Sequence, residues 1–309
     1  MHQEPAIPEL PEVETVMRGL ASVLRGQVIR HAETRRAGLR WPFPPGLVAA
    51  LMGARVEGFR RRGKYMLMRL DGRESVLIHL GMSGRMVARH RDAAAAAVAR
   101  MAPQGIASDA RGHNQPPELH EHLMLETEDG WRVGFVDPRR FGSVDLIARD
   151  AEDSHRLLAG LGPEPLEAGF TVAALEAALH GKVTPIKAAL LDQKVVAGLG
   201  NIYVSEALHR AHIRPDISAA TLVLKSGAPS KRLEDLAEGV RTVLIEAIDA
   251  GGSTLRDFRA ADGNSGYFQH RFAVYDREGE PCPTPRCKGV IKRIVQSGRS
   301  SFFCPVCQH

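Results

Sequence analysis

The chain lacks long apolar runs, and its first 281 residues contain no cysteine. No segment approaches the roughly 18 consecutive apolar residues that a membrane-spanning helix requires. The N-terminus also lacks the apolar core of a secretory signal, so we expect a cytoplasmic protein without a membrane partner. A secreted protein stabilised by disulfides would usually spread its cysteines through the fold. What remains is a globular composition, with 44% hydrophobic and 25% charged residues among 309.

Positive charge is in slight excess, with a net charge of +5 and a pI of about 9.2. This excess permits nucleic-acid binding without establishing it, because many enzymes that bind no polyanion are equally basic. The distribution is more informative, since basic residues gather in three segments. These segments contain Arg60, Arg61, Arg62 and Lys64, then Arg139 and Arg140, and finally Lys288, Lys292, Arg293 and Arg299.

The first half of the chain alternates apolar and polar residues between Gly or Asp-Gly turns. This period of two predicts half-buried antiparallel strands, which follow one helix over about residues 12–24. A sandwich of two sheets is the expected arrangement. The segments with this pattern are residues 28–41, 54–70, 74–87, 122–137 and 142–148.

Residues 92–117 interrupt the strand pattern with a stretch that is poor in bulky apolar residues and rich in Gly, Pro and Ala. We interpret it as an inserted, mobile surface loop. Beyond residues 161–166 the period changes to 3.6, which predicts helices, several of them closed by Gly. The expected helices cover residues 171–181, 185–198, 201–211 and 231–251.

All four cysteines fall within the last 28 residues, so they indicate one local site. Their spacing is that of two paired knuckles on a hairpin, with strands over 290–296 and 300–303 and Arg299 near its tip. Four thiolates complete a tetrahedral site and leave no position for water, so we expect one structural Zn²⁺ rather than a catalytic one. The predicted ligands are Cys282, Cys287, Cys304 and Cys307.

The segment PELPEVETV, residues 8–16, places prolines and carboxylates at the start of the first predicted helix. Taken alone, this pattern is an ordinary helix start. The segment indicates a particular family only together with the other motifs of the chain. These motifs follow one another in order to the C-terminus, and only residues 92–117 lie outside the series. These motifs are RRGKY, HLGMSG, DPRRFG, LGPEP, GLGNIYVSEAL, GGSTLRDF, GYF and the four cysteines.

Together these motifs resemble the bacterial formamidopyrimidine-DNA glycosylases, base excision repair enzymes that excise 8-oxoguanine and ring-opened purines from DNA. The resemblance implies an α+β multidomain fold. An N-terminal antiparallel β-sandwich would cover residues 8–150, a helical helix-two-turn-helix domain 151–262, and a zinc-ribbon hairpin 268–309. It also implies double-stranded DNA with oxidised purines as the partner and a nucleoid-associated location. A monomer is the default expectation.

The resemblance further implies a catalytic set. In the family the nucleophile is the α-amine of an N-terminal proline, which matches Pro8, with Glu9 as the neighbouring acid/base. An α-amine has a pKa of about 8 against about 10.4 for lysine, so much more of it is reactive at neutral pH. Lys64 matches the lysine assigned to β-elimination. Arg299 matches the arginine of δ-elimination, for which we favour stabilisation of the leaving phosphate because a guanidinium is a poor proton donor.

Further positions match residues of the family that contact DNA. Extruding a base leaves a hole in the duplex, and Met82, Arg139 and Phe141 match the residues that fill it. A glycine-rich loop over residues 260–267 could close over a flipped purine. The remaining matched contacts are His120, Lys182, Lys187 and Asn201, together with Arg139 again.

The chain departs from the family pattern at its beginning. Seven residues precede Pro8, so its nitrogen is a tertiary amide and cannot act as a nucleophile. Ile7 stands where the family has its initiator methionine, and isoleucine codons differ from AUG in a single base. We favour translation that starts at codon 7 and exposes Pro8 on trimming. Proteolytic removal of the heptapeptide is a second route, and an inactive protein, or one that uses Lys64 slowly, is a third.

Two other functions stay open at this point. A related enzyme of the endonuclease VIII type would prefer oxidised pyrimidines, although PELPEVETV and the GYF loop favour the purine branch. A non-catalytic, zinc-stabilised protein that binds damaged DNA would share the fold and the basic surface but lack a free amine at Pro8.

Overall fold

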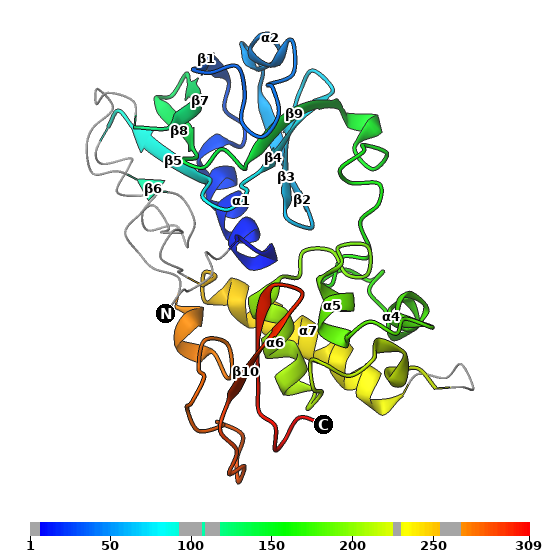
Figure 1. The fold of residues 1–309 in the computed structure, drawn as a ribbon. Coiled ribbons are helices and arrows are strands. Elements are labelled where there is room, and N and C mark those ends of the chain that lie inside the picture. Colours follow the sequence, from blue (N-terminus) through cyan, green and yellow to red (C-terminus); the bar gives the residue numbers. More distant parts are fainter. Residues whose placement is uncertain (1–6, 93–106, 109–117, 225–229, 254–266) are drawn as a thin grey trace. The chain divides into compact units, whose positions relative to one another are not determined.

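The computed structural model describes residues 7–92, 107–108, 118–224, 230–253 and 267–309 (Figure 1). The predicted loops over 92–117 and 260–267 therefore lie largely outside the described residues. The chain divides into two compact units, one made of residues 1–159 with 250–267 and the other of 160–249 with 268–309. Among the described residues, no helix has the length and apolar character needed to cross a membrane.

The first unit begins with helix α1, Leu10–Leu24, which starts two residues earlier than predicted. The reason is a local cap: the backbone N–H of Glu9 donates to Oε2 of Glu12 at 3.0 Å, which satisfies a donor that the helix leaves unpaired. Pro11 fits the first turn because it lacks an N–H. Apolar residues at helical spacing, including Val13, Val16 and Leu20, are buried.

Two sheets form the rest of the first unit. One has the order β1-β7-β8-β5-β6 and the other the order β2-β3-β4-β9. Their strands are antiparallel except for the β5–β6 pair, and a short helix, α2 (Leu47–Leu51), was not predicted. The strands are β1 Ile29–Thr34, β2 Val56–Arg62, β3 Tyr65–Leu70, β4 Glu74–His79, β5 Arg85–His90, β6 Ala107–Ser108, β7 Glu121–Thr127, β8 Trp131–Val136 and β9 Ser143–Ala148.

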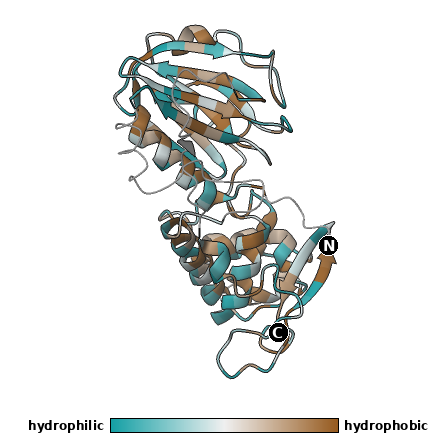
Figure 2. Cartoon of the chain, turned by 90° about the vertical axis from the view of Figure 1, so that its left-hand side faces the viewer, coloured by the Kyte–Doolittle hydropathy of each residue, from teal (hydrophilic) through white to brown (hydrophobic). Residues whose placement is uncertain are grey.

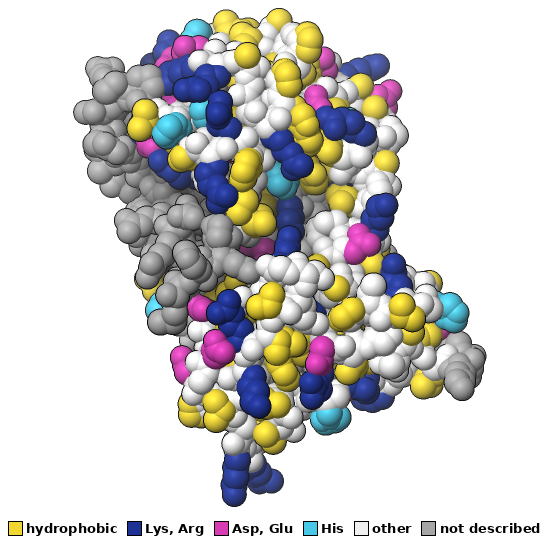
Figure 3. All heavy atoms as spheres, in the orientation of Figure 1, with side chains coloured by type: hydrophobic (Ala, Val, Ile, Leu, Met, Phe, Trp, Pro, Cys, Tyr) yellow, Lys and Arg dark blue, Asp and Glu magenta, His cyan; other side chains and the backbone are white. Residues whose placement is uncertain are grey.

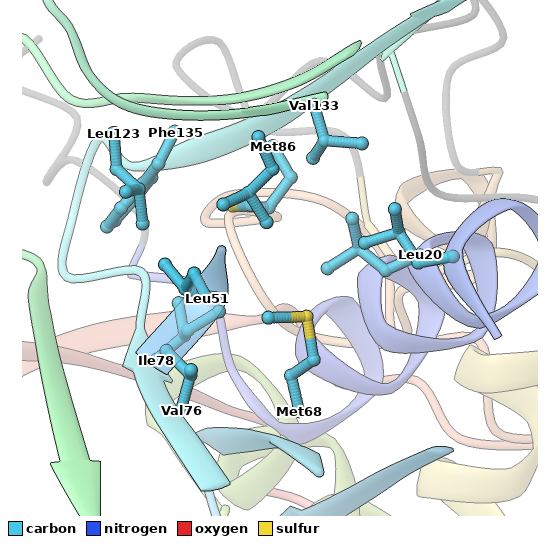
Figure 4. A pocket seen from close by; sticks show the side chains of 11 residues that line it. Leu20, Leu51, Met68, Val76, Ile78, Met86, Leu123, Val133 and Phe135 are labelled. Carbon is cyan, nitrogen blue, oxygen red and sulfur yellow. The ribbon is translucent and has the colours of Figure 1, made fainter. Parts of the chain in front are cut away.

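The core of this unit lies between α1 and the two sheets. Figure 4 shows side chains from α1 and from both sheets pointing into one apolar interior, among them Leu20, Met68 and Phe135. The space left between them is about 10 Å³, which is at the lower limit for one water molecule. This interior is therefore packed hydrophobic core and not a ligand site.

The second unit contains helices α4 (Val172–Leu179), α5 (Ile186–Leu191), α6 (Asn201–Arg210) and α7 (Lys231–Asp249). Brown and teal residues alternate along these helices in Figure 2, as expected where each helix buries one apolar stripe. The hairpin of β10 (Lys292–Gln296) and β11 (Arg299–Phe303) follows near the C-terminus. Antiparallel sheets, helices and a cysteine-bearing hairpin confirm the predicted fold class.

One predicted helix is too long. The 3.6 pattern over 185–198 predicts a continuous helix, whereas α5 ends at Leu191. The amide of Gln193 explains the difference: its Nε2 donates to the carbonyls of Leu191 and Leu199, and its Oε1 accepts the N–H of Gly198. These contacts close a compact turn in place of further helical hydrogen bonds.

Candidate nucleic-acid interface and zinc centre

Two loops of the first unit are joined by the buried carboxylate of Asp137. Its Oδ1 accepts the hydroxyl of Ser83 at 2.6 Å, and its Oδ2 accepts the backbone N–H of Gly142 at 2.8 Å. The backbone N–H of Arg139 donates in turn to the Ser83 oxygen at 3.1 Å. A Cβ on Gly81 would lie 2.5 Å from the backbone of the second loop, so the two loops touch through their main chains.

These loops carry the three residues predicted to fill a void in DNA. Met82 is half-buried, and Arg139 and Phe141 are exposed, Phe141 by 45%. The Arg139 guanidinium lies 4.9 Å from the centroid of the Phe141 ring, which is a cation–π distance. Exposing an aromatic ring beside an arginine on a rigid loop costs hydrophobic burial, so the arrangement suits a surface that meets a partner.

His120 belongs to the same part of the first unit. Its backbone adopts φ +70°, and its carbonyl accepts the N–H of Asp137 at 3.0 Å. Close by, Nε2 of the buried His122 lies 2.9 Å from the Asp137 carbonyl. The structure thus brings four of the predicted site residues, Met82, His120, Arg139 and Phe141, around the single residue Asp137. Figure 3 shows Lys and Arg side chains next to hydrophobic ones on one face of this unit.

The predicted nucleophile and its acid/base partner lie just before α1. Pro8 and Glu9 are both buried, and the backbone of Glu9 is extended. The carboxylate of Glu12 anchors this segment: besides the Glu9 N–H it accepts the N–H and the hydroxyl of Ser253 at 2.8 and 2.9 Å. One buried carboxylate therefore ties the segment that contains Glu9 to Ser253.

Lys64 lies in the two-residue turn between β2 and β3 and is half-buried. The preceding Gly63 has φ +56°, a conformation that favours glycine. The turn faces His79, whose pKa is lowered to about 4 by burial and by the positive charges of Lys64 and Arg40. His79 is consequently neutral at physiological pH, and its Nδ1 accepts the N–H of Gly81 at 3.1 Å.

In the second unit Asn201 begins helix α6. Both side-chain amide atoms of Asn201 are buried, and among the described residues neither has a hydrogen-bond partner. A buried amide without partners costs free energy, and the N-terminus of a helix also offers unpaired N–H groups to an anion. Asn201 therefore keeps unused hydrogen-bonding capacity at the start of α6 among the described residues.

Lys187 and Arg299, both predicted site residues, meet at the hairpin. Lys187 is only 1% exposed, and its Nζ donates to the Ser300 carbonyl at 2.6 Å and the Ser301 hydroxyl at 2.8 Å. Arg299 is exposed at the start of β11, and Lys182 is half-buried before α5. A cavity of about 290 Å³ opens beside them and is lined by Lys187, Ala188, Leu191, Asp192, Gln296, Ser297 and Arg299.

The four cysteine sulfur atoms lie within 4.8 Å of one another. Cys282 and Cys307 are 3.7 Å apart, and Cys287 and Cys304 are 3.6 Å apart. Sulfur atoms about 2.3 Å from Zn²⁺ at the corners of a tetrahedron are separated by about 3.8 Å, so these two separations are those of a zinc site. Four thiolates leave no coordination site open, and the bound zinc is structural.

Three family models match the chain in order. They are the formamidopyrimidine-DNA glycosylase N-terminal domain over residues 7–144, the H2TH domain of the same enzymes over 161–259, and the zinc finger found in FPG and IleRS over 279–309. The formamidopyrimidine-DNA glycosylase of Azorhizobium caulinodans is 54% identical over 305 residues, which cover 98% of this chain and all of that protein. The chain belongs to the formamidopyrimidine-DNA glycosylase family.

Other members agree. The enzyme of Acidiphilium cryptum is 55% identical, with 96% of this chain and 98% of that protein covered. The crystal structure of the MutM (Fpg) protein from Thermus thermophilus matches with a TM-score of 0.78 and 36% identity, covering 97% and 98% of the two chains. The Lactococcus lactis Fpg in complex with DNA containing an abasic site matches with a TM-score of 0.80 and 32% identity, covering 97% and 99%.

The sequence motifs do not single out the residues that hold the predicted site residues in place. Asp137 and Ser83 join the loops of Met82 and Phe141, and Glu12 fixes the segment of Pro8. Their motifs contained them, but a buried anchor has no pattern of its own. The only local signal was an acidic residue directly before Pro138 at a strand end.

Proposed function

We propose that this protein is a DNA repair glycosylase that excises oxidised purines, namely 8-oxoguanine and formamidopyrimidines, from duplex DNA. The half-buried Met82 and the exposed Arg139 and Phe141 carry the proposal, because an enzyme that extrudes a base must fill the hole it leaves. A mutant of the Lactococcus lactis Fpg was solved in complex with Fapy-dG containing DNA, and it matches with 32% identity and a TM-score of 0.80, with 98% of this chain and all of that chain covered.

The proposed chemistry starts at the Pro8 nitrogen. This amine attacks C1′ of the damaged nucleotide, the bond between C1′ and the base breaks, and the base leaves with the electron pair and takes up a proton. Opening of the sugar ring converts the adduct to an iminium, with Glu9 placed to move protons at the sugar. Loss of a C2′ proton then expels the 3′ phosphate by β-elimination, and a second elimination expels the 5′ phosphate.

Lys64 and Arg299 have the proposed roles in these eliminations. Lys64 would transfer protons in β-elimination. Because His79 beside it is neutral, the imidazole adds no positive charge next to the Lys64 side chain. Arg299, exposed on the hairpin, would stabilise the leaving phosphate, because a guanidinium holds phosphate oxygens well and donates a proton poorly.

The remaining contacts would be to the phosphate backbone. Asn201 supports this best, since its amide, which has no hydrogen-bond partner among the described residues, lies at the positive end of α6. His120, Arg139 and Lys182 would add backbone contacts. The buried Lys187 would contribute through the hairpin that it holds, because its ammonium already donates to Ser300 and Ser301.

This mechanism requires a free amine at Pro8. We propose that the active chain begins at Pro8, through translation from codon 7 or through proteolysis. The match to the N-terminal domain of the family begins at residue 7, directly before Pro8, which supports this start. A chain that keeps Ile7 would instead be a damage-binding protein without lyase activity.

The test combines the N-terminus with covalent trapping. Protein from its native host is measured by intact mass, and a chain that starts at Pro8 is incubated with borohydride and duplexes that contain 8-oxoguanine opposite cytosine. We expect a reduced protein–DNA adduct, and none from a chain that retains Ile7. A duplex with an oxidised pyrimidine is the comparison: stronger trapping there would favour the endonuclease VIII type of specificity. Absence of any adduct from the Pro8 chain would refute the lyase.

A further inference from the structure

A histidine that the proposed reaction does not use lies against the zinc cluster. His209 is on α6, in the turn before the helix ends, and is 6% exposed. Its Nε2 is 3.6 Å from Sγ of Cys282 and 3.2 Å from the hydroxyl oxygen of Thr284. The Thr284 oxygen is itself 3.4 Å from the same sulfur. Two potential donors therefore converge on one cysteine sulfur.

The position of His209 is set by a neighbour on the same helix face. Glu206, one turn earlier, is fully buried, and its carboxylate accepts the backbone N–H groups of Ala273, Val274 and Tyr275 at 2.8 to 3.0 Å. This clamp fixes the segment before Cys282 against α6. The imidazole of His209 consequently meets the sulfur at a defined place rather than as a freely rotating surface group.

Donation is the direction that the chemistry allows. When zinc is bound, the Cys282 sulfur is a thiolate without a proton, so it can only accept hydrogen bonds. Four thiolates complete the tetrahedron, so His209 is not needed as a ligand. They also place two net negative charges in a partly buried site, and hydrogen bonds to sulfur offset part of that charge.

We propose that His209 is an outer-sphere residue of the zinc centre, which donates its Nε2–H to the Cys282 thiolate and to Thr284, whose hydroxyl donates to the same sulfur. Its role is to retain the metal and thereby to tie the zinc hairpin to α6, the helix that Asn201 begins. The inference concerns zinc retention and does not depend on the proposed glycosylase activity.

The experiment measures the rate at which full-length, zinc-loaded protein transfers its metal to a chromophoric chelator. H209F removes the donor while keeping a ring of similar size, and H209Q places an amide N–H near the original Nε2. Loss of a partner of a metal ligand typically weakens metal binding by about 10- to 100-fold, so we expect zinc transfer from H209F to be about 10-fold faster or more. H209Q should stay close to the wild type.

The control is H212N. His212 also touches the cysteine segment, but through Nδ1 and the backbone carbonyl of Cys307 at 3.1 Å, not through a sulfur. Its zinc transfer should match the wild type. Asparagine tolerates the φ of +55° at this position, so the control does not add backbone strain.

A second readout distinguishes hydrogen bonding from packing. In Co²⁺-substituted protein the thiolate-to-cobalt charge-transfer band should move to lower energy in H209F, because the sulfur loses a stabilising donor. If H209F does not fold, T284V tests the same sulfur from the other side and should show the same direction of shift. Wild-type rates and an unshifted band in H209F, or in T284V where H209F fails to fold, would overturn the proposal.

Discussion

At the scale of the residue, Asp137 and Ser83 explain how exposed side chains are kept in place. A surface loop normally loses little by moving, but here a carboxylate that is fully buried accepts two hydrogen bonds from two loops. Burial in a medium of low polarity makes each of these bonds costly to lose. The exposed Phe141 and Arg139 are therefore presented by a rigid base.

We expect S83A to show this directly. It removes the hydroxyl that donates to Asp137 and accepts from Arg139, so the protein should lose about 1.5–3 kcal/mol of unfolding free energy, the usual range for hydrogen bonds to charged groups. Extrusion of the target base should weaken as well, which 2-aminopurine fluorescence in a duplex can report. S154A is the control, because that exposed serine donates to the nearby carbonyl of Ala151 and not to a buried carboxylate of the described residues. Equal stability of S83A and S154A would contradict this account.

At the scale of the element, Glu152 connects three strands of the second sheet. Its carboxylate accepts hydrogen bonds from Arg60 in β2, Arg69 in β3 and Ser75 in β4, at 2.6 to 3.0 Å. Burial alone would raise the pKa of Glu152, but these three partners outweigh it and lower the pKa to about 2. Glu152 directly follows a short 3-10 helix, Arg149–Ala151, and its carboxylate thus links three strands of the sheet.

This clamp predicts a dependence of stability on pH. The folded pKa of Glu152 lies below its unfolded value, so the stabilisation is complete above about pH 4.5 and is lost as pH falls toward 2. A shift of this size corresponds to about 3 kcal/mol at neutral pH. E152Q should be less stable than the wild type by about that much at pH 7 in urea unfolding, and the difference should shrink at pH 3.

The matched control is D153N. Asp153 bonds the same Arg60, but its side chain is 75% exposed, so solvent screens the interaction. We expect D153N to change stability little and without the same pH dependence. A difference between E152Q and the wild type that is constant from pH 7 to pH 3 would refute the clamp.

At the scale of the whole molecule, the chain consists of two units with different sources of stability. The first has a continuous apolar core between α1 and two sheets. The second depends in part on metal, because its C-terminal hairpin is a two-stranded ribbon, which is marginal alone in water. Lys187 ties that hairpin to α5 through Ser300 and Ser301.

Zinc removal should therefore affect the two units unequally. Both tryptophans, Trp41 and Trp131, belong to the first unit, so their fluorescence reports on it alone. We expect chelation to abolish DNA binding and to change the far-ultraviolet circular dichroism, while the tryptophan emission maximum stays constant. Return of zinc should restore both. A shift of tryptophan emission that accompanies zinc loss would mean that the units do not unfold independently.

The amino-acid sequence alone was sufficient to predict the zinc ligands and several helices and strands, because the interactions that form them are local. The zinc ligands follow from the spacing of Cys282, Cys287, Cys304 and Cys307, because both pairs lie on turns of one hairpin. The strands of the first unit follow from a period of two, and α1 from a period of 3.6 with its cap. In each case residues a few positions apart decide the structure.

Only the tertiary structure decided which residues support those sites. Asp137 meets Ser83 across 54 positions, His209 meets Cys282 across 73, and Lys187 meets Ser300 across 113. No periodicity encodes such pairs, because they depend on how whole elements pack. The same holds for the early end of α5, where the Gln193 amide reaches carbonyls that only the folded turn brings near. Motifs in the sequence predict which residues carry the chemistry, and the packing of distant elements fixes the geometry of those residues.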